Sequence, residues 1–216
     1  MTFWTVNFLL VAAAVLPLRA EALSSCDPCI SSILEGKIPC TDQRYRTFHL
    51  MFELLKTRHA NIIVETGTAR EGSAWCVGDG CSTLLFAEWV KRNGGVFFSV
   101  DIDQNALKKA ESALGDTKNL VHLVWNDSVD FLTKFHGTID CLYLDSFDFD
   151  FDNPTPSQEH HLKEIQAAYP HLTNDSVVII DDCDLPHGGK GKLAIEFLLQ
   201  KGWKIYAQGY QVILVR

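Results

Sequence analysis

Short apolar runs alternate with helical patterns along most of this chain, and that alternation restricts the folds it can adopt. The runs lie at 62–64, 96–100, 120–124, 139–144, 177–180, 203–207 and 211–215. A helical pattern follows each of the first five, while the last two form a strand pair that turns at Gly209. Runs that are apolar throughout are typical of parallel strands covered by helices on both faces. We therefore predict an α/β domain with a doubly wound sheet of seven strands, mostly parallel with the last strand antiparallel.

The start of the chain predicts a targeting segment. The first eighteen residues contain no charged side chain, and an apolar run from Phe8 to Leu18 precedes the small-residue pattern Ala20-Glu21-Ala22. This run is short for a membrane span, which needs about 20 apolar residues, but it suits a signal peptide. We predict a cleaved signal peptide at 1–22, with an uncleaved anchor as the alternative, and no stable membrane span afterwards. Cleavage would place the protein in the secretory pathway or outside the cytoplasm; otherwise it would be membrane-anchored or cytoplasmic.

Residues 23–46 are mixed and turn-rich, and we interpret them as a cysteine-containing extension that precedes an α/β domain at 47–216. The chain has 7 cysteines, so at least one is not paired within it. In an oxidising compartment, the candidates for disulfides are Cys26, Cys29, Cys40, Cys76 and Cys81. The first two form a Cys-x-x-Cys motif that could also be redox-active or half of a metal site, although we favour a structural role. Cys141 lies in an apolar strand and is expected to be a buried free thiol.

The charge balance bears on the kind of ligand. Lysine and arginine total 19 against 27 aspartates and glutamates, which gives a formal net charge of −8. Proteins that bind nucleic acid non-specifically neutralise its phosphates with lysine and arginine. We therefore expect a small-molecule substrate and no nucleic-acid partner, and the sequence leaves the oligomeric state open.

Polar residues gather just after the apolar runs, where ligands bind in sheets of this kind. The first run ends in Glu65-Thr66-Gly67-Thr68, and Gly72 follows before Ser82, which can cap the next helix. The second run ends at Asp101, a place where an acidic side chain commonly accepts hydrogen bonds from ribose hydroxyls. Asp127-Ser128 follows the third run and suits either an adenine edge or simple helix capping.

With these residues, the sequence from 48 to 216 resembles the class I S-adenosylmethionine-dependent methyltransferases, whose sheet is Rossmann-like. The resemblance implies S-adenosylmethionine as cofactor, with Asp101 on its ribose. The cofactor-binding residues that it implies are Glu65, Gly67, Thr68, Gly72, Ser82, Asp101, Asp127 and Ser128. The stretch from Gly78 to Thr83 makes the first loop longer than is usual in the family, which leaves open which glycine lines the cofactor.

The motif layout is similar, more specifically, to the catechol O-methyltransferase-like group, which includes methyltransferase domain 24. There an Asp after the fourth strand and an Asp-Asn pair after the fifth hold a divalent cation; Asp145 and Asp181-Asp182 stand at those places here. Three converging carboxylates repel one another unless a cation or a proton intervenes, and oxygen ligands favour Mg²⁺ or Ca²⁺. Such an ion would lower the pKa of a substrate hydroxyl. The group's lysine base falls on Asp148 here, and the alternative is that the acids are solvated and make local turn bonds.

Three other features are candidates for function. Thr155-Pro156-Ser157-Gln158 predicts a capping box that opens a helix carrying His160 and His161, either of which could act as a base or simply lie exposed. Phenylalanines alternate with aspartates over 147–152, and this loop could accept a cationic or aromatic substrate or be an acidic surface loop. Glycines and lysines at 188–192 could clamp an anionic substrate tail, although their spacing is not that of a P-loop.

We predict an enzyme that transfers the methyl group of S-adenosylmethionine to an oxygen atom of a small-molecule acceptor. A divalent cation is expected to assist the transfer. The catalytic candidates are Asp145, His160 and His161, and the candidate metal ligands are Asp145, Asp181 and Asp182. Two alternatives stay open: a hydroxylase of the cephalosporin-hydroxylase type on the same fold, and a secreted non-catalytic binding domain. The leader favours the alternatives because S-adenosylmethionine is a cytosolic metabolite, whereas the intact set of Glu65, Gly67 and Asp101 favours retained cofactor binding.

Overall fold

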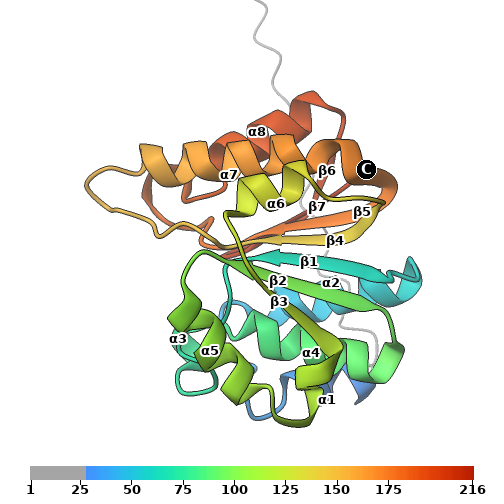
Figure 1. The fold of residues 1–216 in the computed structure, drawn as a ribbon. Coiled ribbons are helices and arrows are strands. Elements are labelled where there is room, and N and C mark those ends of the chain that lie inside the picture. Colours follow the sequence, from blue (N-terminus) through green and yellow to red (C-terminus); the bar gives the residue numbers. More distant parts are fainter. Residues whose placement is uncertain (1–27) are drawn as a thin grey trace, which may run out of the picture.

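The computed structural model describes residues 28–216, which form one seven-stranded sheet with helices on both faces (Figure 1). The predicted signal peptide and Cys26 lie outside the described residues. The strand order is β3-β2-β1-β4-β5-β7-β6, and only the pairs that β7 makes with β5 and β6 are antiparallel. The strands are β1 (Ile62–Thr66), β2 (Val96–Asp101), β3 (Val121–Trp125), β4 (Ile139–Leu144), β5 (Leu172–Ile180), β6 (Lys204–Gln208) and β7 (Val212–Val215). All seven predicted strands and the predicted sheet are therefore confirmed.

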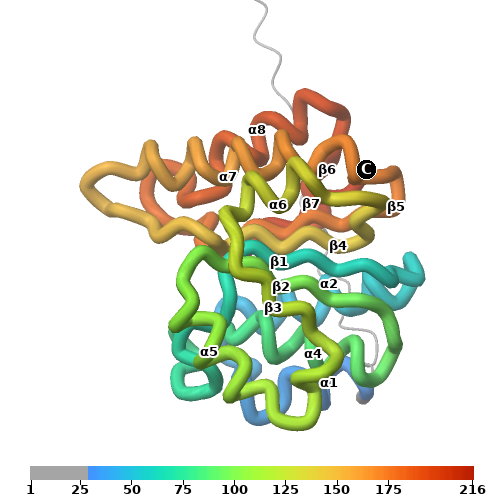
Figure 2. The backbone as a smooth tube through the Cα atoms, viewed as in Figure 1, coloured from blue at the N-terminus to red at the C-terminus, as the bar shows by residue number. Residues whose placement is uncertain are grey.

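The helices divide between the two faces of the sheet, as the backbone trace shows (Figure 2). One face carries α6 (Ser128–Thr133), α7 (Thr155–Ala168) and α8 (Lys192–Gln200). The other carries α1 (Pro28–Leu34), α2 (Tyr45–Thr57), α3 (Cys76–Asp79), α4 (Ser82–Asn93) and α5 (Gln104–Ala113). Short 3₁₀ turns complete the chain at η1 (Gly115–Leu120), η2 (Tyr169–His171) and η3 (Pro186–Gly188). No helix within residues 28–216 is both long and apolar enough to cross a membrane.

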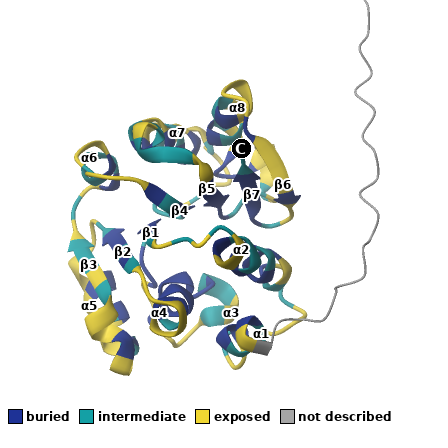
Figure 3. Cartoon of the chain, turned by 90° about the vertical axis from the view of Figure 1, so that its right-hand side faces the viewer, coloured by how far each residue is buried: buried dark blue, intermediate teal, exposed yellow. Residues whose placement is uncertain are grey.

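Alternate residues of each central strand enter two separate cores, because successive side chains of a strand point to opposite faces. In β4, Cys141 and Tyr143 pack with the α2 and α4 side chains, whereas Leu142 and Leu144 pack with those of α7 and α8. All four are buried, which explains why the strand is apolar from Cys141 to Leu144 (Figure 3). The free thiol of Cys141 is buried, as predicted.

The cysteine-containing segment at 23–46 contributes to the first of these cores through α1. Ile30, Ile33 and Leu34 of α1 are almost fully buried and share a hydrophobic cluster with Phe48 and Phe52 of α2. Burying an Ile or Leu side chain contributes roughly 1.5–3 kcal/mol. The helix therefore packs as part of the α/β unit, and it brings the residues that follow it to the sheet.

Two predicted helix starts differ from the structure. At α7, Pro154 is the N-cap and makes no side-chain capping bond, so the capping box at Thr155 is wrong. Its Gln158 turns away to donate to the carbonyl oxygens of His187 and Gly189 instead. At α4, the N-cap is Cys81 rather than Ser82, and Cys81 is joined to Cys76 by a disulfide that closes the loop before this helix.

Candidate active site

A cleft with two lobes opens at the carboxyl ends of β1, β2 and β4. Gly67, Asp101, Ile102 and Ser146 line both lobes, which have volumes of about 260 and 250 Å³. The first lobe extends over the start of α6 and the second over the loop after β1. The cleft therefore lies where an open α/β sheet binds its ligands.

Gly67 brings the β1 loop against the β4 loop at the centre of this cleft. Its φ of +82° lies in the left-handed region, and a Cβ there would be 2.4 Å from the carbonyl oxygen of Asp145. No other residue type fits so close an approach without moving the backbone. Gly67 thus allows the backbone to form the floor shared by both lobes.

Asp101 ends β2 between the two lobes, and backbone donors fix its carboxylate. Oδ2 accepts from the amide of Thr68 at 2.9 Å, and Oδ1 accepts from the amide of Asp103 at 2.8 Å. Each carboxylate oxygen keeps a further lone pair, so the group can also accept from two vicinal hydroxyls. Asp103 caps α5, since its side chain accepts from the amide of Asn105.

The first lobe is built from Asp127, Ser128 and a partly exposed histidine of α7. Asp127 caps α6 through its side chain, and Ser128 Oγ lies 3.1 Å from His160 Nε2. Nε2 is also 3.4 Å from Oε1 of the fully buried Glu164. Burial lowers the pKa of His160, but the hydrogen bond and charge of Glu164 outweigh it and raise that pKa. The Phe147 ring lies 5.3 Å from the imidazole and completes an aromatic wall.

His161 lies elsewhere, although it is adjacent to His160 in sequence. It is fully buried under α7, and its Nδ1 lies 2.7 Å from the carbonyl oxygen of Ser157. Burial lowers its pKa. The structure therefore separates the two histidines: His160 lines the cleft and His161 does not.

Glu65 lies beneath the cleft and organises its floor. It is fully buried, and its Oε2 accepts from Thr83 Oγ1 at 2.7 Å and from Ser99 Oγ at 2.6 Å. Thr83 in turn accepts from the amide of Ala69 at 2.8 Å, which ties the β1 loop to α4. Burial raises the pKa of Glu65 to about 7, against the opposing effect of these hydroxyl donors.

This raised pKa predicts a pH-dependent stability. Glu65 binds a proton more readily in the folded state than in the unfolded state, so the free energy of unfolding should fall as pH rises from about 4.5 to about 7. The expected fall is roughly 3 kcal/mol, at 1.36 kcal/mol for each pH unit. Glu65→Gln removes this component, so its stability relative to wild type should rise across the same range. Urea unfolding at several pH values measures the difference, and Glu159→Gln, at an exposed position, is the control. A difference that does not change with pH would contradict the assignment.

The three predicted acids do converge at the neighbouring ends of β4 and β5, and two cationic side chains meet them there. Lys190 Nζ lies 2.7 Å from Asp145 Oδ1 and 2.8 Å from Asp182 Oδ2. Arg44 Nε lies 3.1 Å from Asp181 Oδ2, and its Nη2 lies 3.4 Å from Asp182 Oδ1. Burial raises the pKa of Asp145 to about 8, because the opposing effect of Lys190 is partly offset by the charges of Asp181 and Asp182.

These contacts show whether the three acids suit a divalent ion. The acids do not suit one, because cationic side chains and hydrogen-bond donors already surround them. Asp181 is fully buried and both of its oxygens are engaged, since Oδ2 also accepts from Tyr143 Oη at 2.5 Å and from Gln211 Nε2 at 3.3 Å. Lys190 Nζ lies between the other two acids and contacts Asp145 Oδ1 and Asp182 Oδ2. Within residues 28–216, no group of three or more His, Cys, Asp or Glu side chains is arranged to hold a metal. The divalent cation stays a prediction, and five of the six carboxylate oxygens already have a partner, with Asp145 Oδ2 as the exception among the described residues.

Asp182 takes an uncommon backbone conformation at this point, with a φ of +52°. Asp and Asn enter the left-handed region more readily than other residues with a side chain. This explains how Asp can stand where the related group has Asn. Neither Asp181 nor Asp182 lines the cleft itself, whereas Asp145 lines its second lobe.

Of the other residues predicted to bind the cofactor, some line the cleft and one lies outside it. Thr68 and Ser82 line the second lobe. Gly72 instead lines a shallow depression beside Lys109, outside both lobes. Arg70 was not predicted; it lines the second lobe and pairs with Asp79 and with Asp148, which joins the loops after β1 and β4.

Sequence reasoning missed Arg44 and gave Lys190 a different role. Arg44 lies in the segment interpreted as an extension, and a single arginine among polar residues carries no signal of burial. Lys190 was predicted to clamp a substrate anion because it lies in a glycine-rich run after β5. The lysines of that run could have been predicted to neutralise the acids, because three converging carboxylates require nearby cations.

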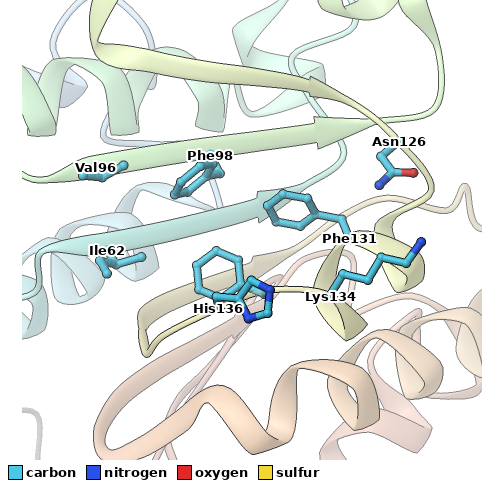
Figure 4. Close-up of a pocket in the computed structure, with 8 residues that line it drawn as sticks. Ile62, Val96, Phe98, Asn126, Phe131, Lys134 and His136 are labelled. Carbon is cyan, nitrogen blue, oxygen red and sulfur yellow. The ribbon is translucent and has the colours of Figure 1, made fainter.

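A second hollow, of about 380 Å³, lies over the face of the sheet next to α6. Ile62 of β1 and Val96 and Phe98 of β2 line it from the sheet, and Phe131 lines it from α6 (Figure 4). Its lining is mostly apolar and includes none of the predicted site residues. The chemistry-bearing side chains therefore gather at the two-lobed cleft.

Comparison with known proteins gives one family match and several solved structures of similar fold. Residues 77–183 match the family model of a methyltransferase domain. In the comparison with curated protein sequences, no match was found. Among solved structures, an O-methyltransferase from Bacillus cereus in complex with SAH is similar, with a TM-score of 0.54 and 14% identity over 90% of this chain and 93% of that one.

Two further structures share the fold. NSun6 from Pyrococcus horikoshii with SFG has a TM-score of 0.57 and 16% identity over 76% of this chain, which spans 50% of that protein. A putative rRNA methylase from Clostridium thermocellum has a TM-score of 0.52 and 15% identity over 76% of this chain and 94% of that one. At these identities the likeness shows the fold alone, and one of the two structures is described as a putative rRNA methylase.

Proposed function

We propose that this chain is a class I S-adenosylmethionine-dependent methyltransferase and that it methylates an oxygen of a small-molecule acceptor. The observation that carries the proposal is the position of Asp101, whose carboxylate is fixed between two lobes of similar volume. The first lobe suits the adenine, with Phe147 and Ile102 as its apolar walls. The second then receives the methionine end, beside Ser82 at the start of α4, where the helix dipole favours a carboxylate.

Asp145 is the side chain that can handle the acceptor's proton. It lines the second lobe, where the methyl group would lie, whereas His160 lines the first. In the transfer, an acceptor oxygen forms a bond to the methyl carbon as the carbon–sulfur bond breaks, and the sulfur keeps that electron pair. The hydroxyl proton passes to Asp145, whose raised pKa suits a base near neutral pH. His160 then contributes to holding the adenine end rather than to proton transfer.

Charge at the cleft supports a small acceptor over a nucleic acid. Asp79, Asp145 and Asp148 line the second lobe together with one arginine, Arg70, which is already paired with two of them. A phosphate backbone would meet these carboxylates at close range. The exposed rings of Phe147 and Phe151 at the loop after β4 favour an acceptor with an aromatic or apolar body.

The test is thermal unfolding with S-adenosylhomocysteine, followed by assay of methyl transfer to a panel of phenols, catechols and short RNAs. A ligand at 100 times its Kd adds about 2.7 kcal/mol, which raises the Tm by roughly 5–10 °C in a domain of this size. We expect that shift, and turnover with a hydroxylated small molecule. A folded protein without the shift would refute cofactor binding; the shift without turnover on any acceptor would favour a binding domain.

We also propose that the protein enters the secretory pathway. The apolar leader at 1–22 and the disulfide between Cys76 and Cys81 support this, because disulfides persist in oxidising compartments. Expression in a eukaryotic host, followed by N-terminal sequencing of the secreted protein, tests it. An intact leader on intracellular protein would contradict the proposal.

A further inference from the structure

A buried ammonium group lies between two of the three carboxylates at the ends of β4 and β5. Lys190 Nζ donates to Asp145 Oδ1 at 2.7 Å, lies 2.8 Å from Asp182 Oδ2, and belongs to a side chain that is only 1% exposed. Arg44 forms an ion pair with Asp181 and a second, longer one with Asp182. Each acid therefore has a cationic partner supplied by the chain itself.

The backbone around Lys190 is built to hold it in this place. Gly189 has a φ of +60°, and a Cβ there would lie 2.0 Å from the carbonyl oxygen of Asp182, so the chain passes the acids at a distance that only glycine allows. The amide of Lys190 donates to that same oxygen at 3.1 Å. Gln158 Nε2 donates to the carbonyl oxygen of Gly189 at 3.0 Å. The ammonium is thus anchored before any ligand binds.

A divalent ion would compete with this ammonium for the same oxygens. Mg²⁺ requires near-octahedral oxygen ligands at about 2.0–2.1 Å. An ion held by Asp145 and Asp182 would lie close to Lys190 Nζ, which already contacts Asp145 Oδ1 and Asp182 Oδ2, and two positive charges that close together repel strongly. The third acid offers no replacement, since Arg44, Tyr143 and Gln211 surround it.

We propose that the ammonium of Lys190 is the resident cation of this site and that methyl transfer here needs no divalent metal. The inference deepens the proposed function, on which it rests for its catalytic meaning. Lys190 acts as a positioning residue: it fixes Asp145 Oδ1, while no hydrogen bond within residues 28–216 engages Oδ2, which remains to accept the acceptor's proton.

The decisive experiment titrates Mn²⁺ into tag-free, full-length protein and follows the free ion by electron paramagnetic resonance. We expect no stoichiometric binding to wild type up to about 1 mM, and at least a tenfold gain in affinity, at one ion per chain, in Lys190→Ala. The gain should disappear in the double variant Lys190→Ala/Asp145→Asn. Lys192→Ala removes an exposed lysine two residues away and should behave as wild type.

Either of two results would overturn the proposal: one Mn²⁺ bound to wild type and weakened by Asp145→Asn, or no gain in Lys190→Ala. If Lys190→Ala does not fold, the comparison of wild type with Asp145→Asn decides alone, since equal Mn²⁺ affinities support the proposal and a loss in the variant refutes it. The titration uses no methyl acceptor. Failure of S-adenosylhomocysteine to bind would therefore refute the proposed function while leaving the result for Lys190 intact.

Discussion

Replacing Asp101 with Ala is expected to lower the affinity for S-adenosylhomocysteine by about a hundredfold or more. Hydrogen bonds to a charged group contribute about 1.5–3 kcal/mol each, and every 1.4 kcal/mol is a factor of ten in affinity. The substitution also releases the amides of Thr68 and Asp103, which the carboxylate now holds, so the floor of the cleft loses part of its order. Isothermal titration calorimetry measures the change directly.

The matched variants for this experiment are Asp101→Asn and Asp175→Ala. Asn keeps the shape and one acceptor oxygen, so its affinity should fall between those of wild type and the Ala variant. Asp175 is exposed near the amino end of β5, so its removal changes the net charge equally without touching the cleft. An affinity that is unchanged in a folded Asp101→Ala protein would mean that the cofactor binds elsewhere.

Replacing Arg44 with Met is expected to have the largest effect on stability. Arg44 is 5% exposed and its partner Asp181 is 0% exposed, and removing one partner of a buried ion pair costs about 3–5 kcal/mol because the other charge stays unpaired. The Tm should fall by roughly 6–20 °C, at about 2–4 °C for each kcal/mol. Differential scanning calorimetry checks this, with the exposed Arg46→Met as the control.

The double variant Arg44→Met/Asp181→Asn separates charge from packing. Neutralising Asp181 removes the unpaired carboxylate, so part of the lost Tm should return. If the double variant is less stable than Arg44→Met, the loss comes from packing, since Arg44 also lies 4.3 Å from the centre of the Tyr210 ring.

The sheet could be predicted from the sequence because a strand buried on both faces has a run of consecutive apolar residues. Strand β4 is apolar at four consecutive positions, and each of these enters one of the two cores. The placing of Asp101 and Asp127 followed from the same logic, since each comes directly at or after the end of a strand. Features of this kind can be predicted from the few residues around them in the sequence.

Features that depend on distant partners were not accessible in this way. The capping box at Thr155 failed because Gln158 donates to carbonyls that lie 29 and 31 residues away in sequence. The pairing of Arg44 with Asp181 spans 137 residues, and nothing near Arg44 signals it. Gly72 and His161 were assigned from their neighbours in sequence, yet the fold directs both away from the cleft.

Arg44 also sets a limit on how far this protein can be shortened. A recombinant version trimmed to the matched region at 77–183, or even to the start of α2 at Tyr45, would discard the guanidinium that holds Asp181. Trimming to Tyr45 would spare all seven strands, so the product could retain its sheet while the acids beside the cleft lost their arrangement. Expression boundaries that keep Arg44 and the buried face of α1 must begin at or before Pro28.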